Sequence, residues 1–117
     1  MDYEWMGVYL VDFKNNIGGE FNGKHYAIIL SNSLSENKTL VVVPITSKKK
    51  GKKYRGGITI DCTKYQENPK YEKAFAMVKK IREVDTGRIF KKIVYKLDEE
   101  DIRRLKESIV NVFNLYL

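Results

Sequence analysis

The sequence predicts a mainly β protein with a C-terminal helix, in which the strands form a strongly bent sheet or a small barrel. Several short segments are apolar, β-branched or alternating, and glycine, asparagine and proline turn signals separate them. Beyond Leu97 the apolar residues recur instead at spacings of three and four, which is typical of an amphipathic helix. A chain of 117 residues suffices for one core, and we expect residues 1–117 to form a single domain.

Six segments are expected to form strands that follow one another through short connections. They are residues 8–13, 25–31, 39–46, 58–61, 74–81 and 89–95. Residues 14–24 are rich in glycine and asparagine and predict a flexible loop, whereas residues 64–72 predict a polar connection. Residues 83–88 are expected to form a turn around Thr86 and Gly87.

The C-terminal segment carries the signals of a helix start. Asp98 is expected to cap the helix, with Asp101 three residues later as a variant of the capping box. Glu99 and Glu100 lie in the first turn, where the helix dipole favours acidic side chains. One helix face is apolar and is expected to pack on the sheet: Ile102, Leu105, Ile109, Val112, Phe113 and Tyr116.

The strand that ends at Thr46 and Ser47 leads into the most biased stretch of the chain. Six of the eight residues from Lys48 to Arg55 are basic, and without them the net charge would fall from +7 to +1. Charge concentrated in one segment favours a polyanionic partner, although a solvated loop whose lysines only aid solubility is the alternative. The residues expected to contact the polyanion are Lys48, Lys49, Lys50, Lys52, Lys53, Tyr54 and Arg55.

Composition restricts the setting in which the protein works. Cys62 is the single cysteine, so an internal disulfide is impossible, and a lone thiol suits a reducing compartment. Its expected role is that of a small residue at a strand end, not that of a nucleophile. The apolar runs are shorter than a membrane span, and we expect a cytoplasmic protein that does not enter a membrane. No ligand set at metal-binding spacing is present, so neither a metal nor another cofactor is expected.

Two strand ends carry side chains that could cleave RNA without a metal. Such a reaction needs a base for the ribose 2′-hydroxyl, positive charge at the phosphorus and an acid for the leaving oxygen. His25 could be the base or the acid because imidazole titrates near neutrality, although a surface histidine at a strand end is the plainer interpretation. Thr46 and Ser47 could bind the scissile phosphate, with positive charge from Lys24 and Arg82.

A third group of residues surrounds the turn after residue 81. Arg82, Asp85 and Arg88 are spaced three apart, which fits a structural ion-pair cluster and equally fits an arginine that Asp85 orients toward a phosphate. Two aromatic residues, Phe21 in the glycine loop and Tyr54 in the basic loop, could stack on unpaired bases. Asp85 and Arg88 are therefore included among the candidate RNA-binding residues, and Arg82 joins His25 and Thr46 as a candidate catalytic residue.

The order of these segments resembles a known family. The strings GVYLVDF, GGEFNGKHYAIILSN, LVVVPITS, AFAMVKKIREVDTGRI and LDEEDI follow one another as in the MazF/PemK toxins of bacterial toxin–antitoxin systems. The resemblance implies an SH3-like barrel of the CcdB/MazF type with a C-terminal helix, usually a homodimer. It also implies a metal-independent endoribonuclease, an mRNA interferase that cuts single-stranded RNA at short sequences. Its partner would be an antitoxin, either a polypeptide or an RNA, that blocks the RNA groove.

The resemblance assigns roles position by position. The family loop Gly-x-Glu-x-x-Gly is matched by Gly18, Glu20 and Gly23, and the catalytic threonine by Thr46. The family block Gln-Ile-Arg-x-x-Asp is matched by residues 80–85, which keep the arginine and the aspartate but begin with lysine.

One departure from the family pattern falls on a catalytic position. His25 stands where the family has a catalytic arginine. Either the imidazole has taken over proton transfer, or Lys24 supplies the charge, or this chain is a weak or inactive relative of the family. The same departure leaves a second function open, namely a non-catalytic module that binds nucleic acid or a topoisomerase.

Overall fold

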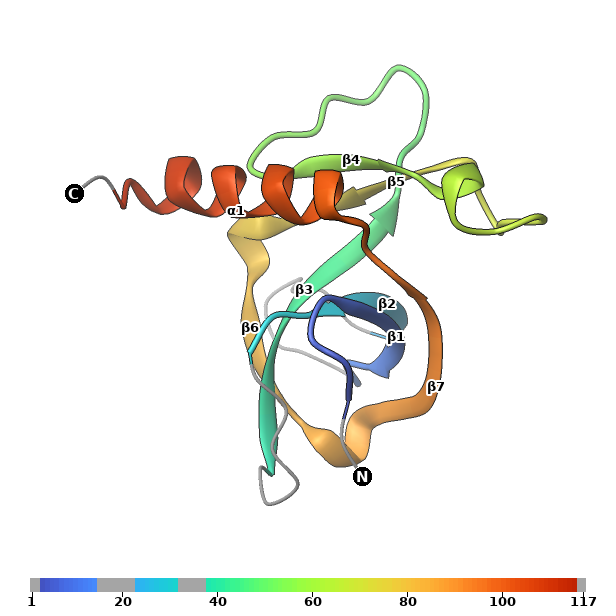
Figure 1. The fold of residues 1–117 in the computed structure, drawn as a ribbon, viewed down its shortest axis with the longest axis vertical. Helices are drawn as coiled ribbons and strands as arrows, with labels where there is room; N and C mark the ends of the chain where they lie inside the picture. The colour runs from blue at the N-terminus through green and yellow to red at the C-terminus, as the bar shows by residue number, and fades with distance from the viewer. Residues whose placement is uncertain (1–2, 15–22, 32–37, 116–117) are drawn as a thin grey trace.

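The computed structural model describes residues 3–14, 23–31 and 38–115, and Figure 1 shows one bent sheet with a single helix lying across one end of it. The strands are β1 (Gly7–Asp12), β2 (Lys24–Ile29), β3 (Thr39–Ser47), β4 (Ile58–Asp61), β5 (Lys73–Ala76), β6 (Arg82–Asp85) and β7 (Ile89–Lys96). The other elements are three short 3₁₀ turns, η1 (Cys62–Lys64), η2 (Val78–Lys80) and η3 (Thr86–Arg88), and the helix α1 (Glu99–Phe113).

All strand pairs in the sheet are antiparallel. The order is β4-β5-β3-β2-β1-β7, and β6 pairs with the first half of β3. Among the described residues no pairing joins β6 to β7, so the sheet is strongly bent but does not close into a ring. The prediction of a mainly β fold with a C-terminal helix is therefore confirmed, and the helix covers β4 and η2 at one end.

The central strands bury side chains on both faces because alternate residues point to opposite sides of a sheet. On β2, Ile28 belongs to one apolar cluster, whereas Ala27 and Ile29 belong to the other. On β3, Val43 and Val42 divide in the same way. The first cluster is closed by β4, β5 and α1, and the second by residues of β6 and β7.

Pro44 explains why the strand expected over residues 74–81 is interrupted. The Pro44 carbonyl accepts the Met77 N–H at 2.8 Å, so the backbone of Pro44 faces β5. Because proline has no N–H, it cannot donate a hydrogen bond toward β5. The ladder breaks there: β5 pairs with β3 at Ile45–Ser47, β6 pairs at residues 39–42, and η2 lies between them. The prediction of a turn over residues 83–88 is wrong in its first half. Residues 82–85 form the strand β6, and the turn is limited to η3 at residues 86–88.

The helix begins as predicted, but Asp101 serves a different purpose from the expected capping box. The Asp98 carboxylate accepts the Asp101 N–H at 2.9 Å, whereas the Asp98 N–H donates to the hydroxyl of Tyr65 and not to Asp101. The Asp101 side chain is only 3% exposed and accepts hydrogen bonds from Tyr65, Lys64 and Arg104. This cluster ties the first turn of α1 to the segment after β4.

The apolar face of α1 packs on the sheet for most of its length. Leu105 is buried, and Ile102, Ile109 and Val112 are partly buried against the first cluster. Phe113 departs from the prediction because it is 46% exposed at the last turn of α1. Tyr116 lies outside the described residues. Within the described segments, no helix is long and apolar enough to cross a membrane.

Candidate functional site

Several candidate residues of β2 and β3 line one pocket of about 300 Å³. Its walls are formed by Leu10, Lys24, His25, Tyr26, Ile45, Thr46, Ser47, Lys70 and Tyr71. Four of the candidate residues, Lys24, His25, Thr46 and Ser47, are thereby brought together from segments about twenty residues apart in the sequence. The pocket lies where β2 begins and β3 ends.

Strand register accounts for the meeting of His25 and Thr46. β2 and β3 are antiparallel with Ala27 opposite Pro44, so two further residues along each strand lead to His25 and Thr46. The glycine loop fixes the start of β2 through Gly23, which has a φ of 77°. The Gly23 N–H donates to the Lys14 carbonyl at 3.0 Å, and the Phe13 N–H donates to the Gly23 carbonyl at 2.8 Å.

The pocket is suited to an anion. Among the residues that the structure describes, its lining includes Lys24 and Lys70 but no aspartate or glutamate. Burial raises the pKa of Tyr71 to about 12, with the nearby Cys62 and Tyr26 adding to the shift, so its hydroxyl keeps its proton at neutral pH. Cations, hydroxyl donors and one imidazole around a cavity of this size fit a phosphate group.

Lys70 and Tyr71 were missed by the sequence reasoning. They lie in the connection between η1 and β5, which the sequence predicts only as a polar linker. The signal that could have located them is their position shortly before β5, since β5 pairs with Ser47 and carries the linker back to the end of β3.

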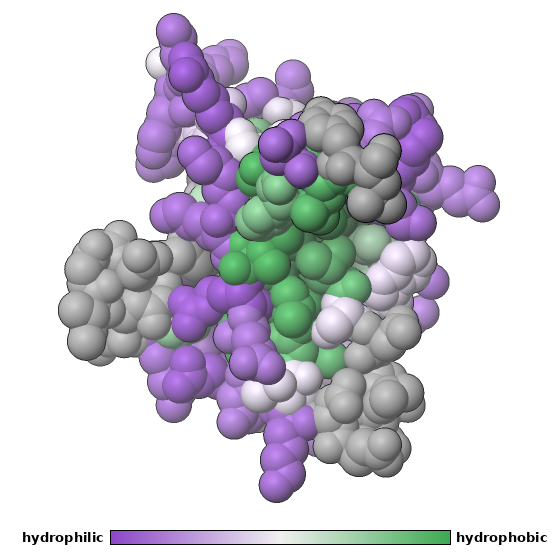
Figure 2. All heavy atoms as spheres, turned by 90° about the vertical axis from the view of Figure 1, so that its left-hand side faces the viewer, coloured by the Kyte–Doolittle hydropathy of each residue, from purple (hydrophilic) through white to green (hydrophobic). Residues whose placement is uncertain are grey.

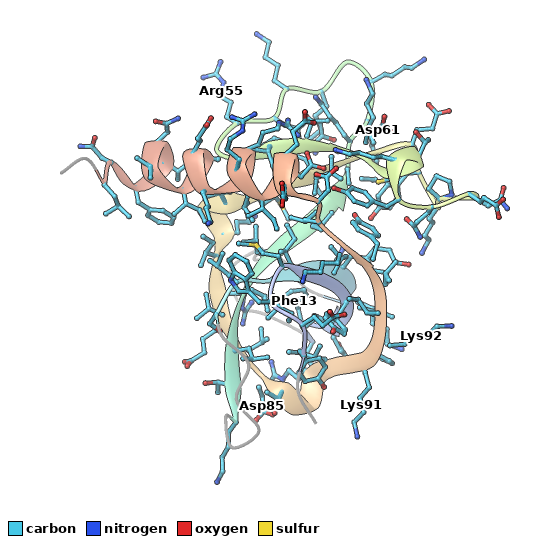
Figure 3. All side chains as sticks on the ribbon, in the orientation of Figure 1. Phe13, Arg55, Asp61, Asp85, Lys91 and Lys92 are labelled. Carbon is cyan, nitrogen blue, oxygen red and sulfur yellow. The ribbon has the colours of Figure 1, made fainter. Side chains whose placement is uncertain are left out.

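Arg82, expected at the same centre, does not line this pocket. It lies on β6 opposite Val42, four residues before Thr46, a separation of about 13 Å along an extended strand. Its guanidinium carbon is 5.5 Å from the centre of the Phe13 ring, whose neighbours include His25 with 6.4 Å between ring centres. Figure 3 places Phe13 at the middle of the bent sheet. Arg82 and His25 therefore both lie near the same buried aromatic ring.

The basic loop begins directly at the edge of the pocket and is fastened there by Tyr54. The Tyr54 hydroxyl donates to the Ser47 carbonyl at 3.2 Å and accepts the Lys49 N–H at 2.9 Å. Its ring packs on Phe75 with 5.2 Å between centres. Lys48 reaches across to donate to the Thr59 hydroxyl at 2.8 Å. Figure 3 shows Arg55 at the end of the molecule occupied by this loop, with Lys91 and Lys92 on a different side.

Asp85 and Arg88 line a different pocket, of about 450 Å³, together with Asp12, Lys14, Gly87 and Phe90. Among the described residues neither Arg82 nor Arg88 forms an ion pair with Asp85, which instead accepts the Gly87 N–H at 2.8 Å. The ion-pair cluster considered for this segment is therefore not formed. Phe21, Gly18 and Glu20 lie outside the described residues.

Cys62 is a buried core residue. It is 2% exposed within the first apolar cluster, and burial raises the pKa of its thiol, with Asp61 adding to the shift. A protonated, buried thiol is a poor nucleophile. Among the residues that the structure describes, no group of three or more His, Cys, Asp or Glu side chains could hold a metal ion.

The class of protein is defined by a small bent sheet with an end helix, in which strand ends carrying lysine, histidine, threonine and serine surround a pocket. A family model described as the PemK-like, MazF-like toxin of type II toxin–antitoxin systems matches residues 5–113. The chain therefore belongs to the PemK/MazF toxin family.

Solved structures agree on the fold. One is the Mycobacterium tuberculosis toxin MazF-mt6, with a TM-score of 0.71 and 14% identity over 95% of this chain and 99% of that one. Another is an endoribonuclease in complex with its cognate antitoxin from Mycobacterial species, with a TM-score of 0.65 and 12% identity over 97% and 96% of the two chains. No curated protein sequence matches the chain.

Proposed function

We propose that the protein is a toxin-type endoribonuclease that cleaves single-stranded RNA through attack of a ribose 2′-hydroxyl, without a metal ion. One observation carries the proposal: within the described part of the chain, His25 and Thr46 share a pocket with two lysines and with no carboxylate. A proton-transfer group, a hydroxyl donor and positive charge are what this reaction needs. Membership of the PemK/MazF family supports the same activity.

The reaction is assigned to the pocket residues as follows. The scissile phosphate lies against Thr46 and Ser47, whose hydroxyls donate to its non-bridging oxygens. His25 accepts the proton of the 2′-hydroxyl as the 2′-oxygen bonds to phosphorus. The bond from phosphorus to the 5′-oxygen breaks, that oxygen takes up a proton from solvent, and a 2′,3′-cyclic phosphate and a 5′-hydroxyl end remain. Lys24 and Lys70 stabilise the charge that develops on the phosphoryl oxygens.

Arg82 acts at longer range in this scheme. Its cation faces the Phe13 ring and not the pocket, so it raises the positive potential around His25 without contacting the phosphate. The family arginine at the position of His25 is replaced by an imidazole, which can carry the proton, while Lys24 beside it carries the charge.

The experiment that tests the activity is cleavage of a long single-stranded RNA in the presence of EDTA. We expect discrete cuts, and no cut where a single 2′-deoxynucleotide replaces the nucleotide on the 5′ side of the cut. Binding of the intact RNA without cleavage would instead support the alternative of a non-catalytic nucleic-acid-binding module.

The basic loop is proposed to bind the RNA backbone. Replacing Lys49 and Lys50 by glutamine is expected to weaken binding and to reduce the slope of log affinity against log salt by about 0.7 for each phosphate that is no longer neutralised. Fluorescence anisotropy with a short RNA at several salt concentrations measures this slope. The matched control removes two cations near the N-terminal segment, Lys96 opposite Gly7 and Lys106 over Trp5. Equal slopes for the two double variants would contradict a role specific to the loop.

We also propose that the toxin forms a homodimer and is neutralised by an antitoxin. The side of the molecule shown in Figure 2 carries a continuous apolar area bordered by hydrophilic residues. The helix α1 ends on this side (Figure 1), and its end carries Phe113 and Leu115, 46% and 57% exposed. An area of this kind supports burial against a second protein chain.

Replacing Phe113 by aspartate is expected to disrupt the homodimer, because a charge would be buried where two apolar surfaces meet. Light scattering after size-exclusion chromatography should give twice the 13.7 kDa chain mass for wild type and the single mass for the variant. The exposed Leu115 gives a milder variant, Leu115→Ala, as a comparison. A wild-type protein that is monomeric at high concentration would overturn the proposal.

A further inference from the structure

The pocket around Phe90 combines an exposed aromatic ring with charges of both signs. Phe90 follows the buried Ile89 on β7 and is 44% exposed. A single exposed aromatic residue is ordinary on a protein surface. Phe90, however, forms one wall of a pocket of about 450 Å³ whose other walls include Asp12, Asp85 and Arg88, with Lys14 beside them.

This pocket adjoins the one that holds His25 and Thr46. Lys24 connects the two pockets. It lines the His25 pocket, and its ammonium group lies 5.4 Å from the centre of the Phe90 ring. Strand pairing agrees, since Asp12 lies opposite Lys24 and Val11 pairs with both His25 and Ile89. A strand of RNA held at one pocket can therefore continue into the other.

The two pockets differ in the chemistry that they accept. As far as the described residues go, the His25 pocket has lysines and no carboxylate. The Phe90 pocket instead places two carboxylates, which repel a phosphate, beside Lys14 and Arg88. One oxygen of each carboxylate is occupied by a backbone N–H, from Lys14 to Asp12 at 2.9 Å and from Gly87 to Asp85 at 2.8 Å. These bonds fix the carboxylates, while the second oxygen of each forms no hydrogen bond within the described residues.

A nucleobase matches this combination. Unpaired bases stack on aromatic rings and form hydrogen bonds along their edges. The second carboxylate oxygens accept from an exocyclic amino group, and Arg88 donates to a ring nitrogen or a carbonyl. We propose that the Phe90 pocket holds an unpaired, amino-bearing base of the RNA that is cleaved at His25 and Thr46, and so selects where the strand is cut. The inference rests on the proposed endoribonuclease function.

Binding and cleavage together test the inference. In a Thr46→Ala background, affinity for short RNAs is measured by fluorescence anisotropy, with uracil or an amino-bearing base placed at each position beside the cut. Phe90→Ala is expected to weaken binding about 5- to 100-fold and to abolish the preference for the amino-bearing base. Phe90→Trp keeps the stacking surface and is expected to retain both properties. Far-ultraviolet circular dichroism checks that each variant is folded, which the exposure of Phe90 favours.

The outcomes separate this inference from the proposed function. If wild type cleaves RNA but Phe90→Ala keeps the same affinity and the same cuts, the inference is overturned and the endoribonuclease proposal stands. If wild type cuts nothing but Phe90→Ala still loses base-dependent binding, the endoribonuclease proposal is overturned, and the Phe90 pocket is a base-binding site that selects no cut. Asp85→Asn retains an oxygen to accept the Gly87 N–H; tighter binding of this variant to RNA of every sequence would show that the pocket takes a phosphate and would also overturn the inference.

Discussion

Thr46→Ala is expected to lower the rate of RNA cleavage by about 10²- to 10³-fold, the usual effect of removing one donor to a developing oxyanion. His25→Ala is expected to cost about 10²- to 10⁴-fold, because the 2′-hydroxyl would lose the group that accepts its proton. Both side chains line the pocket that the phosphate is proposed to occupy. Affinity for RNA should change much less than the rate, since the lysines of the pocket and loop remain.

Matched variants distinguish an effect on the reaction from an effect on folding. Thr46→Ser keeps the hydroxyl and is expected to retain activity. Thr39→Ala removes a threonine hydroxyl from the exposed other end of β3, where it donates to Glu83, and is expected to leave the rate unchanged. His25→Gln keeps a hydrogen-bonding side chain but cannot accept a proton, so it should be as slow as His25→Ala. Wild-type rates in both alanine variants would contradict the assigned mechanism.

The largest expected effect on stability comes from Asp101. Its side chain is 3% exposed and binds Tyr65, Lys64 and Arg104, so Asp101→Asn leaves three partly exposed donors without their buried carboxylate. The expected loss of unfolding free energy is about 3 kcal/mol. Urea unfolding followed by circular dichroism measures it. The control is Glu107→Gln on the same helix, whose pair with Arg103 is about 60% exposed on both sides. It should cost less than about 0.5 kcal/mol.

Acid should weaken the same cluster through Asp98. Lys64 and the Asp101 N–H hold the pKa of the Asp98 carboxyl below its usual value in the folded protein. A carboxyl with a depressed pKa stabilises the fold above its unfolded pKa of about 4, and this contribution is lost as the pH falls through the folded pKa. Asp98→Asn should therefore show a flatter dependence of stability on pH below about 5. An unchanged acid limb would contradict the cluster's role.

Local pattern predicted the strands well where burial alternates. The segment 58–61 was predicted with its observed bounds, and the N-cap of α1 at Asp98 also agrees with the structure. The break between β5 and β6 was not predictable from residues 74–85 themselves, because its cause is Pro44 on a different strand. Secondary-structure propensity is evaluated within one segment, whereas the hydrogen bonds between strands also depend on the residues of the partner strand.

The residues of the candidate site also differ in whether their local sequence position could predict them. His25, Thr46 and Ser47 could be proposed from their positions at strand ends, and the fold brings them together. Lys70 could not be found in this way, since a lysine in a polar linker carries no signal until the linker is folded against β3. Asp101 was expected to accept a hydrogen bond from the helix start, yet its partners Lys64 and Tyr65 lie more than thirty residues away. The spacing of neighbouring residues in the sequence does not predict which distant residues a charged side chain will contact.

The central claim is that His25 and Thr46 act on one RNA phosphate through the neighbouring 2′-hydroxyl. Its most direct test is the chemical identity of the two ends produced at a single cut, determined by mass spectrometry on a short RNA cleaved in EDTA. We predict a 2′,3′-cyclic phosphate on one fragment and a 5′-hydroxyl on the other. A 3′-hydroxyl with a 5′-phosphate, or an intact RNA, would contradict the account.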